Sequence, residues 1–302
     1  MKMEKKSRRQ ALKHLAVGSA SLVALSNAAC APKENSQPET TPIPEKKAMK
    51  GNINHSVCQW CYDKIPLEEL VLAAKDMGIT SIDLLGPDQW SVAQKHGLTC
   101  AMAYGSSLNL TKGFNDPTLH AQLLQDYSES IPKAAAAGLK NVICFSGNRN
   151  GISDEQGLEN CAKGLEPVLK IAQQHNITLV MELLNSKVNH PDYQCDRTEW
   201  GVKLCEKLGS DHFKLLYDIY HMQIMEGDVI ATIQKYHTYI AHYHTGGVPG
   251  RNEIDETQEL YYPAIMRAIV ATGFKGFVAQ EFIPKGADPL ASLRHSIEIC
   301  DI

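Results

Sequence analysis

The chain contains Ile177-Thr178-Leu179-Val180-Met181-Glu182, an apolar, strand-like run that ends on a carboxylate. Three later runs have the same form: Phe213-Lys214-Leu215-Leu216-Tyr217-Asp218, Tyr239-Ile240-Ala241-His242-Tyr243-His244 and Gly276-Phe277-Val278-Ala279-Gln280-Glu281. They recur at intervals of roughly 30 residues, which is the length of one strand–helix–strand unit. Each run therefore predicts one further parallel strand with a polar residue at its carboxyl end.

The earlier part of the chain shows the same alternation of strands and helices. Four more strands are predicted at residues 52–57, 81–85, 98–103 and 141–145. Helix-start signals follow predicted strands along the chain at Pro66, Asp116-Pro117, Ser153 and Asp288-Pro289. Eight strand–helix units with no strand left over predict an α/β fold, a closed (β/α)₈ TIM barrel, as a single domain over residues 51–302. No Gly-rich dinucleotide or phosphate loop follows any strand, which argues against an open-sheet nucleotide binder.

Glu182, Asp218, His244 and Glu281 are predicted to meet, because the carboxyl ends of all barrel strands converge at one mouth. Buried carboxylates without a cation repel one another and lose their hydration, so the group predicts a divalent metal ion. Three oxygen donors and one nitrogen suit manganese, magnesium or cobalt better than a thiol-seeking metal, and manganese is the leading candidate. Zinc stays an alternative.

Several aromatic and polar residues are expected around this mouth. Cys58-Gln59-Trp60-Cys61 has CxxC spacing, but the chain has no second CxxC for zinc and no helix start directly after the motif for redox chemistry. We interpret it as the end of the first strand, with Trp60 facing the mouth together with Tyr104 and Trp90. His242 lies on the same strand face as His244 and is expected just beneath the metal.

Four longer motifs resemble the xylose-isomerase-like barrels, particularly the hydroxypyruvate-isomerase-like sugar isomerases and epimerases. The motifs are Met181-Glu182-Leu183-Leu184-Asn185, Tyr217-Asp218-Ile219-Tyr220-His221-Met222-Gln223, His244-Thr245-Gly246-Gly247-Val248-Pro249-Gly250-Arg251 and Gln280-Glu281.

The resemblance implies a role for each site residue. Glu182, Asp218, His244 and Glu281 would bind the metal, Glu182 and Glu281 would also be the catalytic acid and base, and His221 and Arg251 would contact substrate oxygens. His244 is a departure, because hydroxypyruvate isomerases often carry glutamine there whereas ketose 3-epimerases carry histidine. The resemblance therefore implies a reaction class and leaves the substrate open.

The expected function is a metal-dependent isomerase or epimerase of a small hydroxy-carbonyl compound, either a sugar or a keto-acid. Removal of a proton next to a carbonyl produces an enediolate that a metal ion can stabilise. Two alternatives stay open: a metal-dependent keto-polyol dehydratase on the same barrel, and a sugar-binding protein without catalysis. The loop of residues 251–262 either covers the site or packs on a neighbouring subunit, so a homo-oligomer is also left open.

Residues 1–31 are predicted to be a signal peptide, because a basic segment precedes an apolar, small-residue run over residues 16–29. Ser7-Arg8-Arg9-Gln10-Ala11-Leu12-Lys13 resembles the twin-arginine export motif, and an ordinary secretory signal is the alternative. The segment ends either in a lipid anchor at Cys30 or in simple cleavage after Ala31. Residues 32–50 read as a flexible linker. The protein is therefore expected in the periplasm or cell envelope.

The composition is that of an ordinary globular protein. The 302 residues are 43% hydrophobic and 21% charged, with a net charge of −4. The sequence has no basic stripe and no zinc-finger spacing, which argues against nucleic acid as a partner.

Overall fold

Seven parallel strands form one curled sheet in the part of the chain that the structure, a computed structural model, describes: residues 49–106 and 110–302. The predictions for the signal peptide, and for all but the last two linker residues, lie outside this part. Neighbouring strands follow the order β2-β1-β7-β6-β5-β4-β3. Their bounds are β1 Asn54–Cys58, β2 Ser81–Asp83, β3 Asn141–Cys144, β4 Thr178–Glu182, β5 Phe213–Asp218, β6 Ile240–Thr245 and β7 Phe277–Gln280.

The predicted strand at residues 98–103 is the one that differs, because it forms only isolated parallel bridges. It still lies between β2 and β3: the Ile82 amide donates to the Thr99 carbonyl (3.0 Å), and the Ile143 amide donates to the Ala103 carbonyl (2.9 Å). Between these points the Ala101 amide donates to the Ser81 hydroxyl instead of a strand carbonyl (2.8 Å). The segment thus closes the predicted TIM barrel without regular ladder bonds.

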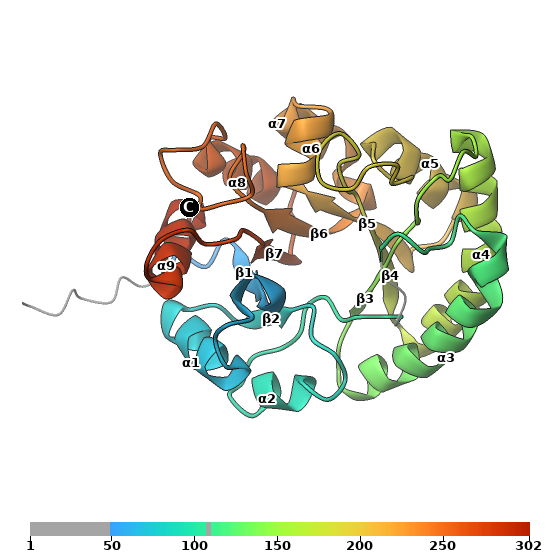
Figure 1. Cartoon of the computed structure of the whole chain (residues 1–302). Helices are drawn as coiled ribbons and strands as arrows, with labels where there is room; N and C mark the ends of the chain where they lie inside the picture. Colours follow the sequence, from blue (N-terminus) through green and yellow to red (C-terminus); the bar gives the residue numbers. More distant parts are fainter. Residues whose placement is uncertain (1–48, 107–109) are drawn as a thin grey trace, which may run out of the picture. The chain divides into compact units, whose positions relative to one another are not determined.

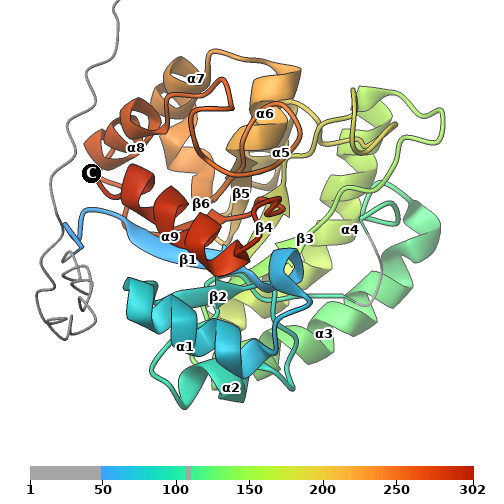
Figure 2. The same ribbon diagram turned by 60° about the vertical axis from the view of Figure 1, so that its left-hand side comes forward.

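Helices surround the strands, as Figure 1 shows. In the turned view of Figure 2, α9 lies close to α1, which agrees with the contacts between these two helices. The helices are α1 Leu67–Met77, α2 Trp90–Gln94, α3 His120–Ala136, α4 Asp154–His175, α5 Thr198–Leu208, α6 Ile219–Met225, α7 Val229–Tyr236, α8 Tyr262–Ala271 and α9 Pro289–Cys300, with short 3₁₀ turns at Gln59–Tyr62, Pro117–Leu119 and His237–Tyr239.

Three helix starts in the described residues, those of α4, α6 and α9, follow from side-chain capping. The Ser153 hydroxyl accepts from the Gln156 amide at the start of α4, and the Asp288 carboxylate accepts from two amides at the start of α9. Two starts differ from the expectation. Pro66 caps α1 and does not belong to its first turn, and Asp116-Pro117 opens a 3₁₀ turn before α3 begins.

The interior of the barrel determines where the site lies. A small apolar cluster inside the sheet includes Val180, Leu216 and Ala279. Side chains in a strand alternate between its two faces, so the residue two positions later points the same way. Glu182, Asp218 and Glu281 therefore lie on the inner face, one layer above an apolar floor.

Both ends of the described chain attach to the barrel. Met49 packs against the main core, and the Lys50 amide donates to the Asp301 carboxylate at 3.0 and 3.1 Å. These two residues, which the sequence assigns to the linker, already belong to the barrel.

Among the helices of residues 49–302 that the structure describes, none has the length and apolar character needed to cross a bilayer.

Candidate active site

The structure brings the four predicted metal-site residues together at the barrel mouth. Glu182 is the last residue of β4, Asp218 is the last of β5, His244 lies near the end of β6 and Glu281 directly follows β7. One donor atom from each lies within 4.8 Å of the others, and all four side chains are buried. This convergence is the arrangement that the strand ends predicted.

The distances within this group leave one carboxylate oxygen without a donor. His244 Nδ1 lies 2.8 Å from Glu281 Oε2 and 3.3 Å from Glu182 Oε1. Glu182 Oε1 is fully buried and accepts no hydrogen bond. A buried, unpaired carboxylate oxygen is costly, and a cation beside it would remove that cost. Three carboxylates and one imidazole therefore fit a divalent metal ion.

The three carboxylates differ in their affinity for protons. Burial raises the pKa of Glu182, and the nearby charge of Glu281 raises it further. Burial also raises the pKa of Asp218 well above its usual value. Although burial acts in the same sense on Glu281, the charges of Arg251 and His244 hold its pKa well below the usual range. Glu281 is therefore ionised, while Glu182 and Asp218 bind a proton more readily.

Arg251 reaches into the site from the loop after β6, as expected. Its Nη2 lies 2.5 Å from Glu281 Oε2 and 3.5 Å from Asp218 Oδ2. The guanidinium packs over the rings of Trp60 and Tyr220, with its Cζ 5.1 and 5.5 Å from the ring centroids. The backbone of Arg251 is left-handed, with φ of 59°, and strained conformations of this kind cluster at functional sites.

His221 lies beside Asp218, also as expected. Its backbone amide donates to Asp218 Oδ1 (3.1 Å), which caps α6. The Asn185 side-chain amide donates to His221 Nδ1 (2.6 Å), so the ring hydrogen lies on Nε2. Burial lowers the pKa of His221 well below its usual value, which keeps the ring neutral. The Nε2 atom is 3.6 Å from Asp218 Oδ2 and makes no hydrogen bond, so it can donate to a substrate oxygen.

The fold and these residues agree with the family comparison. The family model described as the xylose isomerase-like TIM barrel matches residues 71–301. The chain belongs to this family.

Three of the proteins similar to this xylose isomerase-like barrel are isomerases or epimerases by name. The present chain is 23% identical over 236 residues to a 2-oxo-tetronate isomerase of Haemophilus influenzae, and the match covers 74% of this chain and 91% of that protein. It is 29% identical over 157 residues to a hydroxypyruvate isomerase of Escherichia coli, covering 52% and 60%. The solved D-psicose 3-epimerase of Clostridium cellulolyticum H10, with D-tagatose, has a TM-score of 0.67 at 16% identity, covering 83% and 100%. This last likeness shows a common fold.

Two of the aromatic residues expected at the mouth are near the site, and one is not. Trp60 Nε1 donates to Glu281 Oε1 (2.8 Å). Tyr104 is 39% exposed, and burial together with the charges of the site raises its pKa to about 12. The prediction that Trp90 faces the mouth was wrong. Its ring is buried in the helix–sheet core, and its indole nitrogen donates to the Leu85 carbonyl. The apolar ring, carried by the first residue of α2, is more stable in this core than at a polar mouth.

Asp83, the last residue of β2, is fully buried and was not among the predicted site residues. Asp83 Oδ2 lies 2.5 Å from His242 Nε2 and 3.6 Å from His244 Nε2. His242 therefore has the position beneath His244 that was expected, with a carboxylate partner from across the barrel. The predicted strand ran over residues 81–85, which placed Asp83 in its middle, so the pattern of acidic strand ends did not point to it.

The loop after Arg251 packs on its own barrel. Glu253 accepts from the amides of Lys285 and Gly286 and from the Ser292 hydroxyl, and Gln223 donates to Glu259. These contacts hold the loop beside the mouth, which is the position that a loop covering the site would have.

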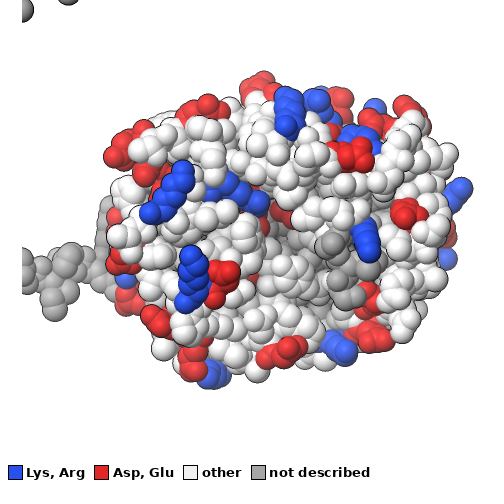
Figure 3. Space-filling view, in the orientation of Figure 1, with Lys and Arg blue, Asp and Glu red and all other residues white. Residues whose placement is uncertain are grey.

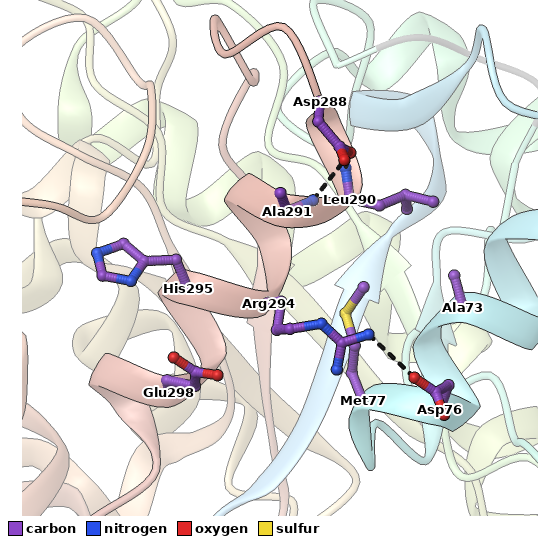
Figure 4. A pocket seen from close by; sticks show the side chains of 9 residues that line it. All are labelled: Ala73, Asp76, Met77, Asp288, Leu290, Ala291, Arg294, His295 and Glu298. Carbon is purple, nitrogen blue, oxygen red and sulfur yellow. Dashed lines mark hydrogen bonds and ion pairs between the residues drawn. The ribbon is translucent and has the colours of Figure 1, made fainter. Parts of the chain in front are cut away.

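Outside the mouth, one hollow lies between α1 and α9 (Figure 4). The Arg294 guanidinium lies 2.9 Å from Asp76 Oδ2 across it, and it contains none of the predicted site residues. On the face seen in Figure 3, acidic and basic side chains are interspersed and neither sign forms a large continuous patch.

Replacing Trp60 with phenylalanine is expected to lower kcat/KM by about 10- to 100-fold. The change removes a hydrogen bond to a buried charged carboxylate, an interaction of about 1.5–3 kcal/mol. Steady-state kinetics at saturating metal measure this effect. Trp200→Phe is the matched control, because Trp200 donates to the Asp154 carbonyl outside the site. Equal kinetics for the two variants would show that the Trp60 bond does not assist the reaction.

Proposed function

We propose that this protein is a divalent-metal-dependent isomerase or epimerase of a small hydroxy-carbonyl compound, a sugar or keto-acid. The observation that supports the proposal is a cluster of four buried side chains at the mouth of the barrel, Glu182, Asp218, His244 and Glu281. The named relatives, a 2-oxo-tetronate isomerase and a hydroxypyruvate isomerase, support the same reaction class.

Glu182 is suited to take the proton from the carbon next to the substrate carbonyl. The cation would lie beside its buried Oε1, so its second carboxylate oxygen would accept the proton. Burial raises the pKa of this carboxyl. In an isomerase the proton returns to the neighbouring carbon. When bound by the four side chains, a divalent ion would stabilise the negative charge that develops on the substrate oxygens.

Glu281 is held differently and has a complementary role. Its Oε1 accepts from Trp60 and its Oε2 lies against His244 and Arg251. This fixed carboxylate comes from β7, and Glu182 comes from β4, so β5 and β6 lie between them in the sheet. In an epimerase, one carboxylate would remove the proton from one face of the carbon and the other would return a proton to the opposite face.

His221 and Arg251 would orient the substrate. His221 presents an unpaired Nε2–H beside Asp218, and Arg251 presents a guanidinium whose aromatic neighbours limit its movement. A hydroxyl or carboxylate oxygen of the substrate can accept from both. This fixed geometry favours proton transfer because the reacting carbon need not be reoriented.

The native metal and the location of the protein complete the proposal. We propose manganese, since the donor set is rich in carboxylate oxygen, and metal analysis of the purified protein distinguishes it from magnesium, cobalt and zinc.

We also propose export by the twin-arginine signal of residues 1–31, with Cys30 as the candidate lipid anchor. An enzyme of the cell envelope would meet free sugars or keto-sugars.

Removing the metal is expected to abolish proton exchange completely. The mature protein, with manganese, is incubated in D₂O with a panel of ketoses, keto-sugars, hydroxypyruvate and 2-oxo-tetronate, and deuterium is located by mass spectrometry and NMR. Chelator-sensitive deuterium at a carbon next to the carbonyl, without loss of water, supports the proposal. Loss of water indicates the dehydratase, and substrate binding without exchange indicates a sugar-binding protein. Exchange that persists in chelator would refute the metal requirement.

A further inference from the structure

Asp83 stands on the far side of His244 from the carboxylate group. The two ring nitrogens of His244 face different partners: Nδ1 faces Glu281 and Glu182, while Nε2 faces Asp83 Oδ2 at 3.6 Å and the Cys58 sulfur at 3.7 Å. An imidazole can bind a metal only through a nitrogen that carries no hydrogen. If Nδ1 is the ligand, the hydrogen must therefore lie on Nε2, towards Asp83.

Asp83 is itself held in place by donors on both oxygens. Ser56 and Ser81 hydroxyls lie 2.6 and 3.3 Å from Oδ1, and His242 Nε2 lies 2.5 Å from Oδ2. The side chain has no exposed surface. A carboxylate buried inside a barrel is costly unless it is paired and hydrogen-bonded. Three residues therefore support a charge that a barrel interior would otherwise exclude.

We propose that Asp83 is a positioning residue that orients His244, so that Nδ1 is free to bind the metal and Nε2–H points at the Asp83 carboxylate. His242, Ser56 and Ser81 hold Asp83 in that position. The inference rests on the proposed metal site. Carboxylate partners of this kind fix the ring orientation of metal-binding histidines, and their removal typically costs 10- to 100-fold in metal affinity.

The geometry separates this role from simple packing. Asp83 is on β2 and His244 is on β6, two strands that are not neighbours in the sheet. Their side chains meet across the barrel interior, directly beneath the group that would hold the metal. If Asp83 only satisfied His242, its loss would alter stability and leave metal affinity unchanged.

Replacing Asp83 with asparagine is the direct test. The amide group can donate to His244 Nε2 and so favour the wrong tautomer, whereas the size and shape of the side chain are retained. We expect the dissociation constant for Mn²⁺, measured by titration calorimetry, to rise 10- to 100-fold, with near-ultraviolet circular dichroism unchanged. Asp301→Asn is the matched control: this buried carboxylate accepts from the Lys50 amide and lies outside the group at the mouth, so the Mn²⁺ affinity of the variant should change less than about 3-fold.

A second measurement needs no variant at the site. Nitrogen-15 NMR of the Zn²⁺-loaded wild-type protein, with labelled histidine, reports which nitrogen of His244 binds the metal. A zinc-bound Nδ1 with a hydrogen-bonded Nε2–H supports the proposal, and a zinc-bound Nε2 overturns it. Unchanged Mn²⁺ affinity in Asp83→Asn also overturns it. If the wild-type protein binds no metal at all, the proposed function itself has failed.

Discussion

Replacing Glu182 with glutamine is expected to lower the rate of deuterium exchange at the substrate carbon by about 10³-fold at saturating manganese, within the 10²- to 10⁴-fold range of a general base. The amide oxygen can still face a metal ion, but it cannot accept the proton that the carboxylate takes. Exchange measured by NMR under single-turnover conditions isolates this step.

Two comparisons make the Glu182 result specific. Metal content must be measured on the same sample, because Glu182 is also a predicted ligand and a weaker site would lower the rate indirectly. Glu259→Gln is the control, since Glu259 pairs with Gln223 outside the group of four. If Glu182→Gln with a full complement of metal keeps more than a tenth of the wild-type exchange rate, Glu182 is not the base.

Replacing Asp218 with asparagine is expected to act on binding and on stability in opposite directions. Metal affinity should fall by about 100-fold, because a charged ligand becomes neutral; this is at the upper end of the loss for a supporting residue. The protein stripped of metal should instead melt a few degrees higher than the stripped wild type. Burial raises the pKa of Asp218 in the folded protein, so ionisation of this carboxyl opposes folding when no cation is bound.

The pH dependence of the Asp218 effect has a definite sign. A carboxyl whose pKa is raised on folding stabilises the folded state below its unfolded pKa, and this contribution is lost as pH rises through the folded pKa. The stripped wild type should therefore gain stability, relative to Asp218→Asn, as the pH is lowered from neutral. Differential scanning calorimetry in chelator at several pH values measures this. Asp211→Asn is the control, because the Asp211 side chain is fully exposed. A variant that melts lower than wild type at every pH would contradict the argument.

The two predictions describe one property of the site. Three carboxylates converge in a buried mouth, and Arg251 is the guanidinium that contacts two of them. Such a group is unfavourable for folding and favourable for binding a divalent cation. The same charges therefore lower stability in the stripped protein and supply the affinity in the loaded one.

Much of the site could be predicted from the sequence because strand alternation and strand spacing are local properties. An apolar run that ends on Glu182, Asp218 or Glu281 places that side chain on the inner face once its register is set by buried neighbours such as Val180. The loop from His244 to Arg251 was also predictable, because its length limits how far Arg251 can reach. The fold followed from eight such units in succession.

The rest depended on how the barrel closes. In the segment at residues 98–103 the Ala101 amide donates to the Ser81 hydroxyl and not to a strand carbonyl, which no local pattern reveals. Asp83 meets His242 across 159 positions of sequence, and its approach to His244 Nε2, at 3.6 Å, likewise joins β2 to β6. The sequence by itself determined that β4 and β5 end on Glu182 and Asp218 and that both side chains point inward, since that is a matter of local alternation. Only the tertiary structure decided which of their atoms face one another, because closure of the sheet brings side chains from β2 and β6 into the same interior.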